Sequence, residues 1–137
     1  RALWRNIARG DRPRSPHQFA LVLEQRAADI IQPDVGRCGL SEFRTIATLA
    51  ESHGVRVIPH LGPALGVYLA ASIHAAACLP DLPFMEFQPS VFDRANAILK
   101  TPIDCRAGHL TVPSAAGLGI DVDEAALTKF CRRRTYD

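Results

Sequence analysis

A short apolar run, Val55-Arg56-Val57-Ile58-Pro59-His60, decides how this chain folds. Its β-branched side chains predict a short buried strand. Proline cannot donate a hydrogen bond to a sheet, so we expect the strand to end at Pro59. His60 then stands at the carboxyl-terminal tip of the strand, and a loop follows it. A histidine at that point is either a packing residue or a proton-transfer group, and the rest of the sequence helps to decide between them.

Helices and further strands alternate with this run. We expect strands over residues 4–8, 29–32 and 84–87. The first helix should follow the cap Ser15 and run to about Ala27, with Gln18 completing a capping box. A second helix should be capped by Ser41 and stopped by Gly54. The third helix, residues 64–77, is apolar on all sides, which predicts heavy burial.

The segment after Gln88 has a different pattern, because prolines punctuate it and its polar loops are longer. Residues 109–112 are a candidate strand, and Asp123 can cap a last short helix over residues 124–130. The chain before this segment is therefore an alternation of strands and helices, βαβαβαβ. That order predicts an α/β fold with a parallel sheet and right-handed crossovers.

An ionisable residue stands at the end of each predicted strand: Asp11, Asp34, His60 and Glu86, at intervals of 23, 26 and 26 residues. The carboxyl ends of the strands of a parallel barrel open on one face, where active sites are built. The four side chains would then surround a common mouth. Each has a simpler interpretation on its own, as a turn aspartate, a structural histidine or a satisfied buried carboxylate.

Composition narrows the choice of function. The chain has 137 residues, 47% of them hydrophobic, and a formal net charge of +2, which is too small to favour nucleic acid or an anionic membrane as a partner. No apolar run is long enough to span a bilayer. The four cysteines are widely spaced, which favours reduced thiols in a cytoplasmic protein over a disulfide framework or a zinc site. The chain begins at Arg1 without a methionine, which suggests a fragment boundary.

Several motifs carry a family resemblance. Residues 30–39, Ile-Ile-Gln-Pro-Asp-Val-Gly-Arg-Cys-Gly, are followed by Val57-Ile58-Pro59-His60 and Phe84-Met85-Glu86-Phe87. In this order they resemble the mandelate racemase and muconate-lactonizing family of the enolase superfamily. Residues 8–11 are similar to that family's fifth-strand motif, and residues 112–120 to its carboxyl-terminal signature. The resemblance covers nearly the whole chain.

The resemblance implies a fold and the boundary between its two parts. Residues 1–90 would be the C-terminal half of a (β/α)₈ TIM-type barrel, strands five to eight, and residues 91–137 would end the barrel and return to a capping domain. A complete barrel needs about 200–250 residues, so half of the barrel would lie outside this chain.

The resemblance also implies a site. Carried over by motif, His60 is the acid/base, Asp34 its orienting partner, Glu86 a protonated donor to the substrate carboxylate, and Asp11 the third ligand of Mg²⁺. Racemase-like members usually have glutamate at the position of Asp11. The family takes two more metal ligands, and often a lysine base, from strands that this chain lacks. The remaining histidines, His17, His53, His74 and His109, are expected to be structural or on the surface.

These implications lead to a functional hypothesis with alternatives. The chain would be part of an acid-sugar dehydratase, a lyase that removes the proton α to a carboxylate with Mg²⁺ and then eliminates the β-hydroxyl as water. Its partners would be a small carboxylate substrate, a sugar acid, and further copies of itself in a homo-oligomer. A racemase or epimerase of the same family remains open, as does a catalytically silent half-barrel that pairs with another copy or subunit. We expect no turnover from this stretch by itself.

Overall fold

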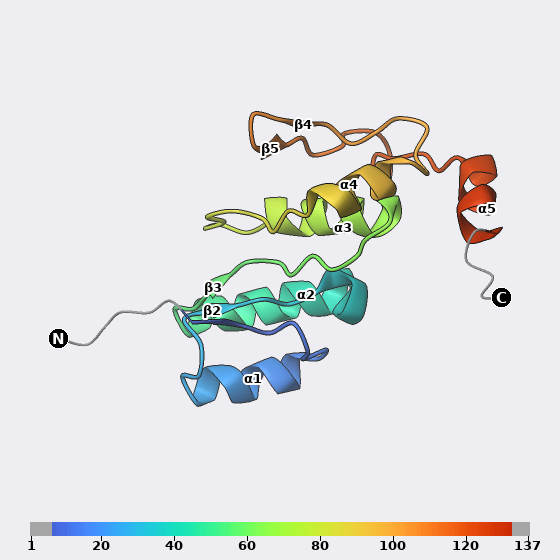
Figure 1. Ribbon diagram of the computed structural model, residues 1–137. Helices are drawn as coiled ribbons and strands as arrows, with labels where there is room; N and C mark the ends of the chain where they lie inside the picture. The colour runs from blue at the N-terminus through green and yellow to red at the C-terminus, as the bar shows by residue number, and fades with distance from the viewer. Residues whose placement is uncertain (1–6, 133–137) are drawn as a thin grey trace.

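The computed structural model describes residues 7–132 of the chain. Three parallel strands form its central sheet in the order β1 (Ala8–Arg9), β2 (Ile30–Ile31) and β3 (Arg56–Val57). Helix α1 (Pro16–Glu24) connects β1 to β2, and helix α2 (Val35–Ser52) connects β2 to β3 (Figure 1). The predicted α/β class and the parallel order of these units are confirmed. Residues 4–6 of the first predicted strand lie outside the described residues.

Backbone hydrogen bonds continue the sheet beyond these short strands. The amide of Gln32 donates to the carbonyl of Arg9 at 2.9 Å, and the amide of Ile58 donates to the carbonyl of Ile31 at 3.0 Å. The last of the series joins the amide of His60 to the carbonyl of Pro33 at 3.1 Å. The parallel register therefore reaches His60 and holds its backbone beside the end of the neighbouring strand.

Helix α1 begins as its sequence predicts, and the Ser15 hydroxyl accepts from the amide of Gln18. The return bond of the capping box differs, because Gln18 Oε1 accepts from the amide of Arg14, one residue before the cap. The helix also ends at Glu24, earlier than the predicted Ala27. Arg26, with φ +48°, has turned out of the helical conformation by then.

Helix α2 begins seven residues before the predicted start, because its cap is Asp34 and not Ser41. Asp34 is its N-cap and accepts from the amide of Gly36 at 2.8 Å, whereas Ser41 lies inside the helix. The prediction of a loop over residues 35–39 was wrong because a buried aspartate starts the first turn there. Gly39, with φ +76°, then changes the direction of the helix. The helix stops at Gly54 as predicted, where φ is +66°.

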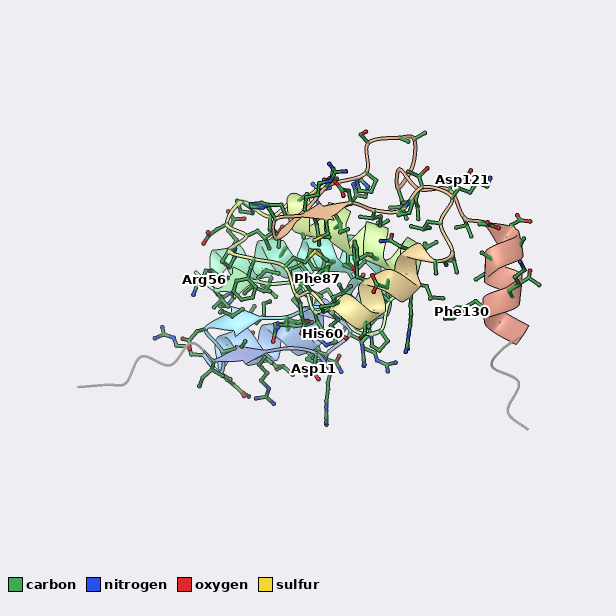
Figure 2. All side chains as sticks on the ribbon, turned by 45° about the horizontal axis from the view of Figure 1, so that its top comes forward. Asp11, Arg56, His60, Phe87, Asp121 and Phe130 are labelled. Carbon is green, nitrogen blue, oxygen red and sulfur yellow. The ribbon has the colours of Figure 1, made fainter. Side chains whose placement is uncertain are left out.

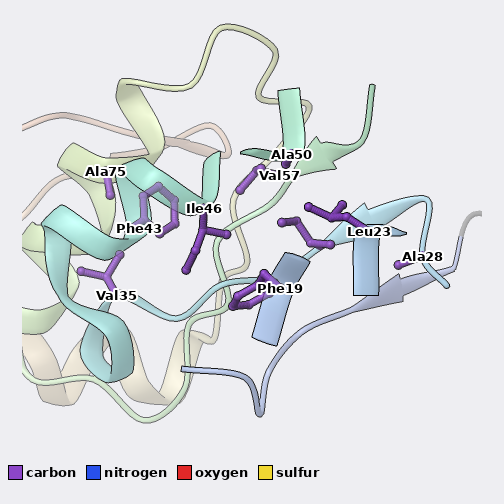
Figure 3. Close-up of a cluster of buried hydrophobic side chains, with 10 residues drawn as sticks. Phe19, Leu23, Ala28, Val35, Phe43, Ile46, Ala50, Val57 and Ala75 are labelled. Carbon is purple, nitrogen blue, oxygen red and sulfur yellow. The ribbon is translucent and has the colours of Figure 1, made fainter. Parts of the chain in front are cut away.

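The main core lies between the sheet and helices α1 and α2, and Figure 3 shows its apolar side chains meeting there. Its largest members are Phe19, Leu23, Ile31, Phe43 and Ile46. Each comes from the face that its helix or strand turns inward, as the spacing of apolar residues predicts. Phe19, Ile31 and Ile46 are fully buried, which anchors both helices against the strands that carry the candidate site.

A second core joins α3 (Gly66–Ala77) to α4 (Pro89–Asn96). Most of α3 is buried as predicted, although Val67 remains 49% exposed. Helix α4 was missed, although Pro89 in its first turn is a favourable helix start. The two helices approach closely at Gly66, where an added Cβ would lie 3.0 Å from the carbonyl oxygen of Ala95 in α4 and 2.5 Å from Cδ2 of Leu99, which follows α4.

The predicted fourth strand at residues 84–87 was wrong, because this segment is irregular. Side chains occupy the Leu61 backbone groups that a strand partner would use. Glu86 Oε2 accepts from the amide of Leu61 at 2.8 Å, and Gln88 Nε2 donates to the carbonyl of Leu61 at 2.9 Å. The segment thus lies beside the end of β3 without a backbone ladder, and Phe84 remains 63% exposed.

The remainder is a hairpin and a final helix. Strands β4 (Cys105–Arg106) and β5 (His109–Leu110) pair antiparallel, and the latter lies in the predicted strand 109–112. Helix α5 (Glu124–Arg132) is capped as predicted, because Asp123 Oδ1 accepts from the amide of Ala126 at 2.9 Å. In Figure 1 this helix lies beyond the ends of α3 and α4, and its Leu127 and Phe130 pack against the second core. Among residues 7–132, no helix combines the length and the apolar character that crossing a membrane requires.

Candidate active site

Two side chains at neighbouring strand ends form the centre of the candidate site. His60 follows β3, and its Nδ1 lies 2.9 Å from Oδ2 of Asp34, which follows β2. An ionised carboxylate can only accept a hydrogen bond, so Nδ1 of His60 is the donor. In the neutral ring, Nε2 then carries no proton and offers its lone pair. The His60 side chain is 22% exposed and that of Asp34 is 4% exposed. The pair therefore presents an imidazole to solvent and keeps its carboxylate partner buried.

Three hydrogen-bond donors and one guanidinium group surround the Asp34 carboxylate. Oδ1 accepts from the amide of Gly36 and from the hydroxyl of Tyr68. Oδ2 accepts from His60 and lies 3.4 Å from Nε of Arg37, whose side chain is 42% exposed. The first turn of α2 also supports the negative charge, because helix N-termini favour anions. The charge of Asp34 is thus stabilised by several groups, although the residue is buried.

Tyr68 was not predicted as a site residue. It comes from the first turns of α3, 34 residues after the carboxylate that it contacts. Burial, followed by the hydrogen bond to Asp34, raises the pKa of the Tyr68 phenol well above its ordinary value, so the hydroxyl remains a donor. The available sequence signal was a polar aromatic residue at the start of a mostly apolar helix. Arg37 had a signal as well, because it lies one helical turn after Asp34.

Glu86 lies next to the centre. Its Oε2 bonds to the amide of Leu61, the residue that follows His60, although the fourth strand is not formed. The sequence predicted Glu86 at the end of a fourth strand, which residues 84–87 do not form. Glu86 nevertheless lies beside the residue that follows His60, and its side chain is partly buried.

Asp11 follows β1 and is exposed. Figure 2 shows it on the side of the sheet where His60 lies. Arg9 and Arg12 line the same shallow depression. Mg²⁺ prefers six oxygen ligands, and within residues 7–132 no three His, Cys, Asp or Glu residues cluster closely enough to hold a metal ion. One exposed carboxylate in a depression that Arg9 and Arg12 also line cannot supply this coordination, so the residues present do not form a magnesium site on their own.

The other histidines make contacts outside this centre. His53 Nδ1 lies 3.0 Å from the carbonyl of Leu49 at the end of α2, and His74 Nε2 lies 3.1 Å from the carbonyl of Leu118. His17 and His109 are exposed. These positions agree with the structural and surface roles predicted for them.

Comparison with known proteins identifies the family. A family model described as "Enolase C-terminal domain-like" matches residues 1–126. The chain belongs to the enolase superfamily. Within it, the mandelate racemase and muconate-lactonizing family is the one that the sequence motifs predicted, and solved structures of that family are similar to this chain.

The relatives of this enolase-superfamily chain include enzymes named for sugar acids and their lactones. It is 41% identical over 117 residues to D-galactarolactone cycloisomerase from Agrobacterium fabrum, covering 79% of this chain and 31% of the relative. It is 33% identical over 114 residues to arabinonate dehydratase from Saccharolobus solfataricus, covering 82% and 30%. A solved member of the enolase superfamily from Agrobacterium tumefaciens superimposes with a TM-score of 0.82 at 38% identity, covering 88% and 31%. The chain thus spans about a third of the length of these relatives.

Proposed function

We propose that the chain is the C-terminal half of a (β/α)₈ barrel. Residues 1–90 would supply strands five to eight, and residues 91–137 would end the barrel and return to a capping domain. The parallel order β1-β2-β3 supports this assignment, as does the position of Glu86 beside the end of β3. The exposed Phe84 and Ile7, 63% and 55% accessible, would be covered by the other half of the barrel.

The activity that we propose is dehydration of a sugar acid, and the hydrogen bond between His60 and Asp34 is the observation that supports it. A base outside this chain removes the proton next to the substrate carboxylate. The carbon–oxygen bond at the β position then breaks, and His60 Nε2 delivers the proton that lets the hydroxyl leave as water. Asp34 stabilises the imidazolium form that this acid step requires and orients the ring through Nδ1. The resulting enol becomes a keto acid.

Glu86 and Asp11 have supporting roles in this proposal. Glu86 Oε1 would donate to the substrate carboxylate while Oε2 holds the amide of Leu61. Asp11 would supply one ligand of a Mg²⁺ ion, and carboxylates outside this chain would supply the others. The acid step assigned to His60 does not depend on that ion.

A cycloisomerase is the second candidate, because the 41% identical relative has that name. The same histidine and aspartate could transfer a proton during opening of a sugar lactone. The two reactions differ in mass balance. Dehydration lowers the mass of the substrate by one water, whereas isomerisation leaves it unchanged.

The experiment is a screen of the intact protein that carries this chain against sugar acids and their lactones with Mg²⁺, read by mass spectrometry. A product lighter by one water supports dehydration, and an isomer of the lactone supports the second candidate. His60→Asn should abolish turnover while the circular dichroism spectrum is retained, and His109→Asn, an exposed histidine, is the matched control. Near wild-type turnover by His60→Asn would remove this residue from the mechanism. No turnover with any compound, together with self-association of the chain, would favour a silent half-barrel.

A further inference from the structure

The two oxygens of Asp34 have separate partners. Oδ1 accepts from the amide of Gly36 and the hydroxyl of Tyr68, and Oδ2 faces His60 and Arg37. A carboxylate offers about four acceptor sites. Three hydrogen bonds use three of them, and the Arg37 ion pair lies at Oδ2. Because Asp34 is only 3% exposed, water has little access to replace a donor that is lost.

This separation determines which oxygen is available to the imidazole. The bond from Gly36 is local, since an N-cap aspartate accepts from the first turn of its own helix. The bond from Tyr68 comes from α3 and therefore ties the carboxylate to a second element. Two donors from different directions resist rotation of the carboxylate, which leaves Oδ2 pointing at Nδ1 of His60.

Tyr68 reaches the carboxylate because residue 36 is glycine. A Cβ at this position would lie 2.7 Å from Cζ of the Tyr68 ring, 2.9 Å from Cε1 and 3.0 Å from Cε2. The ring therefore packs directly on the backbone of the first turn of α2. Any larger residue at position 36 has to displace the ring, so Gly36 and Tyr68 form a matched pair.

We propose that Tyr68 is a positioning residue for His60, and that it acts by holding Oδ1 of Asp34 so that Oδ2 keeps the proton of Nδ1. The consequence is an Nε2 lone pair directed to the open side of the site. The catalytic meaning of this arrangement rests on the proposed function, whereas the arrangement itself is a property of the chain. It goes beyond the pair of His60 and Asp34, because it assigns control of that pair to a residue on another helix.

The test is ¹⁵N NMR of the His60 ring in the 137-residue chain. Wild type should show the neutral ring protonated on Nδ1. In Tyr68→Phe, the ratio of the Nδ1-protonated to the Nε2-protonated ring should fall by about tenfold, as expected for the loss of one hydrogen bond to a charged group. Ser72→Ala is the matched control, one turn later on α3. It removes a buried hydroxyl for which residues 7–132 supply no hydrogen-bond partner, so it should leave the ratio unchanged.

A ratio in Tyr68→Phe equal to that in Ser72→Ala would overturn the proposal. Gly36→Ala provides a second variant that keeps the hydroxyl but displaces the ring, and it should shift the ratio in the same direction. If Tyr68→Phe does not fold, the result with Gly36→Ala decides, and an unchanged ratio there also overturns the proposal. Gly62→Ala is the control for an added methyl, because its Cβ would lie 3.5 Å from His60 Cε1, an ordinary contact.

Turnover of the intact protein separates this proposal from the proposed function. Tyr68→Phe should lower kcat more than it raises KM. It should also move the pH profile of kcat, because Asp34, Arg37 and Glu86 are ionisable groups around His60 and Asp34 has lost the hydrogen bond from Tyr68. A change in the NMR ratio without any activity in wild type would refute the proposed function and leave the positioning role intact. Activity with unchanged kcat and an unchanged ratio would refute the positioning role alone.

Discussion

Replacing Asp34 by alanine or by asparagine tests whether this residue serves as cap and acceptor at once. Alanine removes the N-cap of α2 and leaves the Tyr68 hydroxyl and the Nδ1 proton of His60 without their acceptor. Asparagine keeps an oxygen for Gly36 and Tyr68. The asparagine side chain then presents its amide NH₂ to Nδ1 of His60. Nδ1 can accept this hydrogen bond only if the ring proton moves from Nδ1 to Nε2.

The magnitudes follow from these contacts. Loss of the cap costs about 1 kcal/mol. The two donors left without an acceptor cost about 1 kcal/mol each, at the low end of the range because both are only partly buried. Arg37 adds about zero, since its side chain is 42% exposed. The free energy of unfolding should thus fall by about 3 kcal/mol in Asp34→Ala and by about 1 kcal/mol in Asp34→Asn, where the loss is mainly charge assistance.

Urea denaturation followed by circular dichroism measures both values, and Arg37→Ala is the matched control, expected to leave stability unchanged. Equal destabilisation by alanine and asparagine would refute the reasoning, because the cap and the Tyr68 bond would then contribute nothing beyond the charge. Wild-type stability of Asp34→Ala would show that the hydrogen-bond network does not form.

Three further outcomes are expected. Calorimetry of this chain with Mg²⁺ should detect no micromolar site, because Asp11 offers one exposed carboxylate to an ion that is coordinated by six oxygens. A micromolar site would contradict the metal assignment. Burial is the main cause that raises the pKa of Cys38 from 9.0 to about 11, so its reactive thiolate is scarce at pH 8 and grows only as the pH approaches 11. Alkylation of Cys38 at pH 8, followed by mass spectrometry, should therefore be much slower than that of the exposed Cys78, and equal rates would contradict this. Gly66→Ala should lower the free energy of unfolding by about 1–3 kcal/mol, because its Cβ would lie 2.5 Å from Leu99 Cδ2 and 3.0 Å from the carbonyl oxygen of Ala95 and would overpack α3 against the end of α4. Unchanged stability in urea would contradict this packing.

Local signals were sufficient for much of the fold. The second and third strands, the cap of α1 by Ser15 and the stop of α2 at Gly54 were predictable, because strand and cap preferences depend on neighbouring residues. The first strand, predicted over residues 4–8, shares only Ala8 with β1 among the described residues. The start of α2 was not, since both Asp34 and Ser41 are good caps and only the buried position of Asp34 favours the earlier one. The segment 84–87 also has a strand-like composition, yet pairing requires free backbone groups on a neighbour, and side chains occupy those of Leu61.

The candidate site, like the fold, was predictable from the sequence only in part. The sequence by itself determined that Asp34 and His60 end adjacent parallel strands, and a βα repeat is enough to bring two such ends together. Only the tertiary structure decided how the carboxylate divides its two oxygens, because Tyr68 reaches it from a helix 34 residues later and through the space left by Gly36. Such a contact depends on how α3 packs against α2, and no local pattern of residues encodes the distance between two helices.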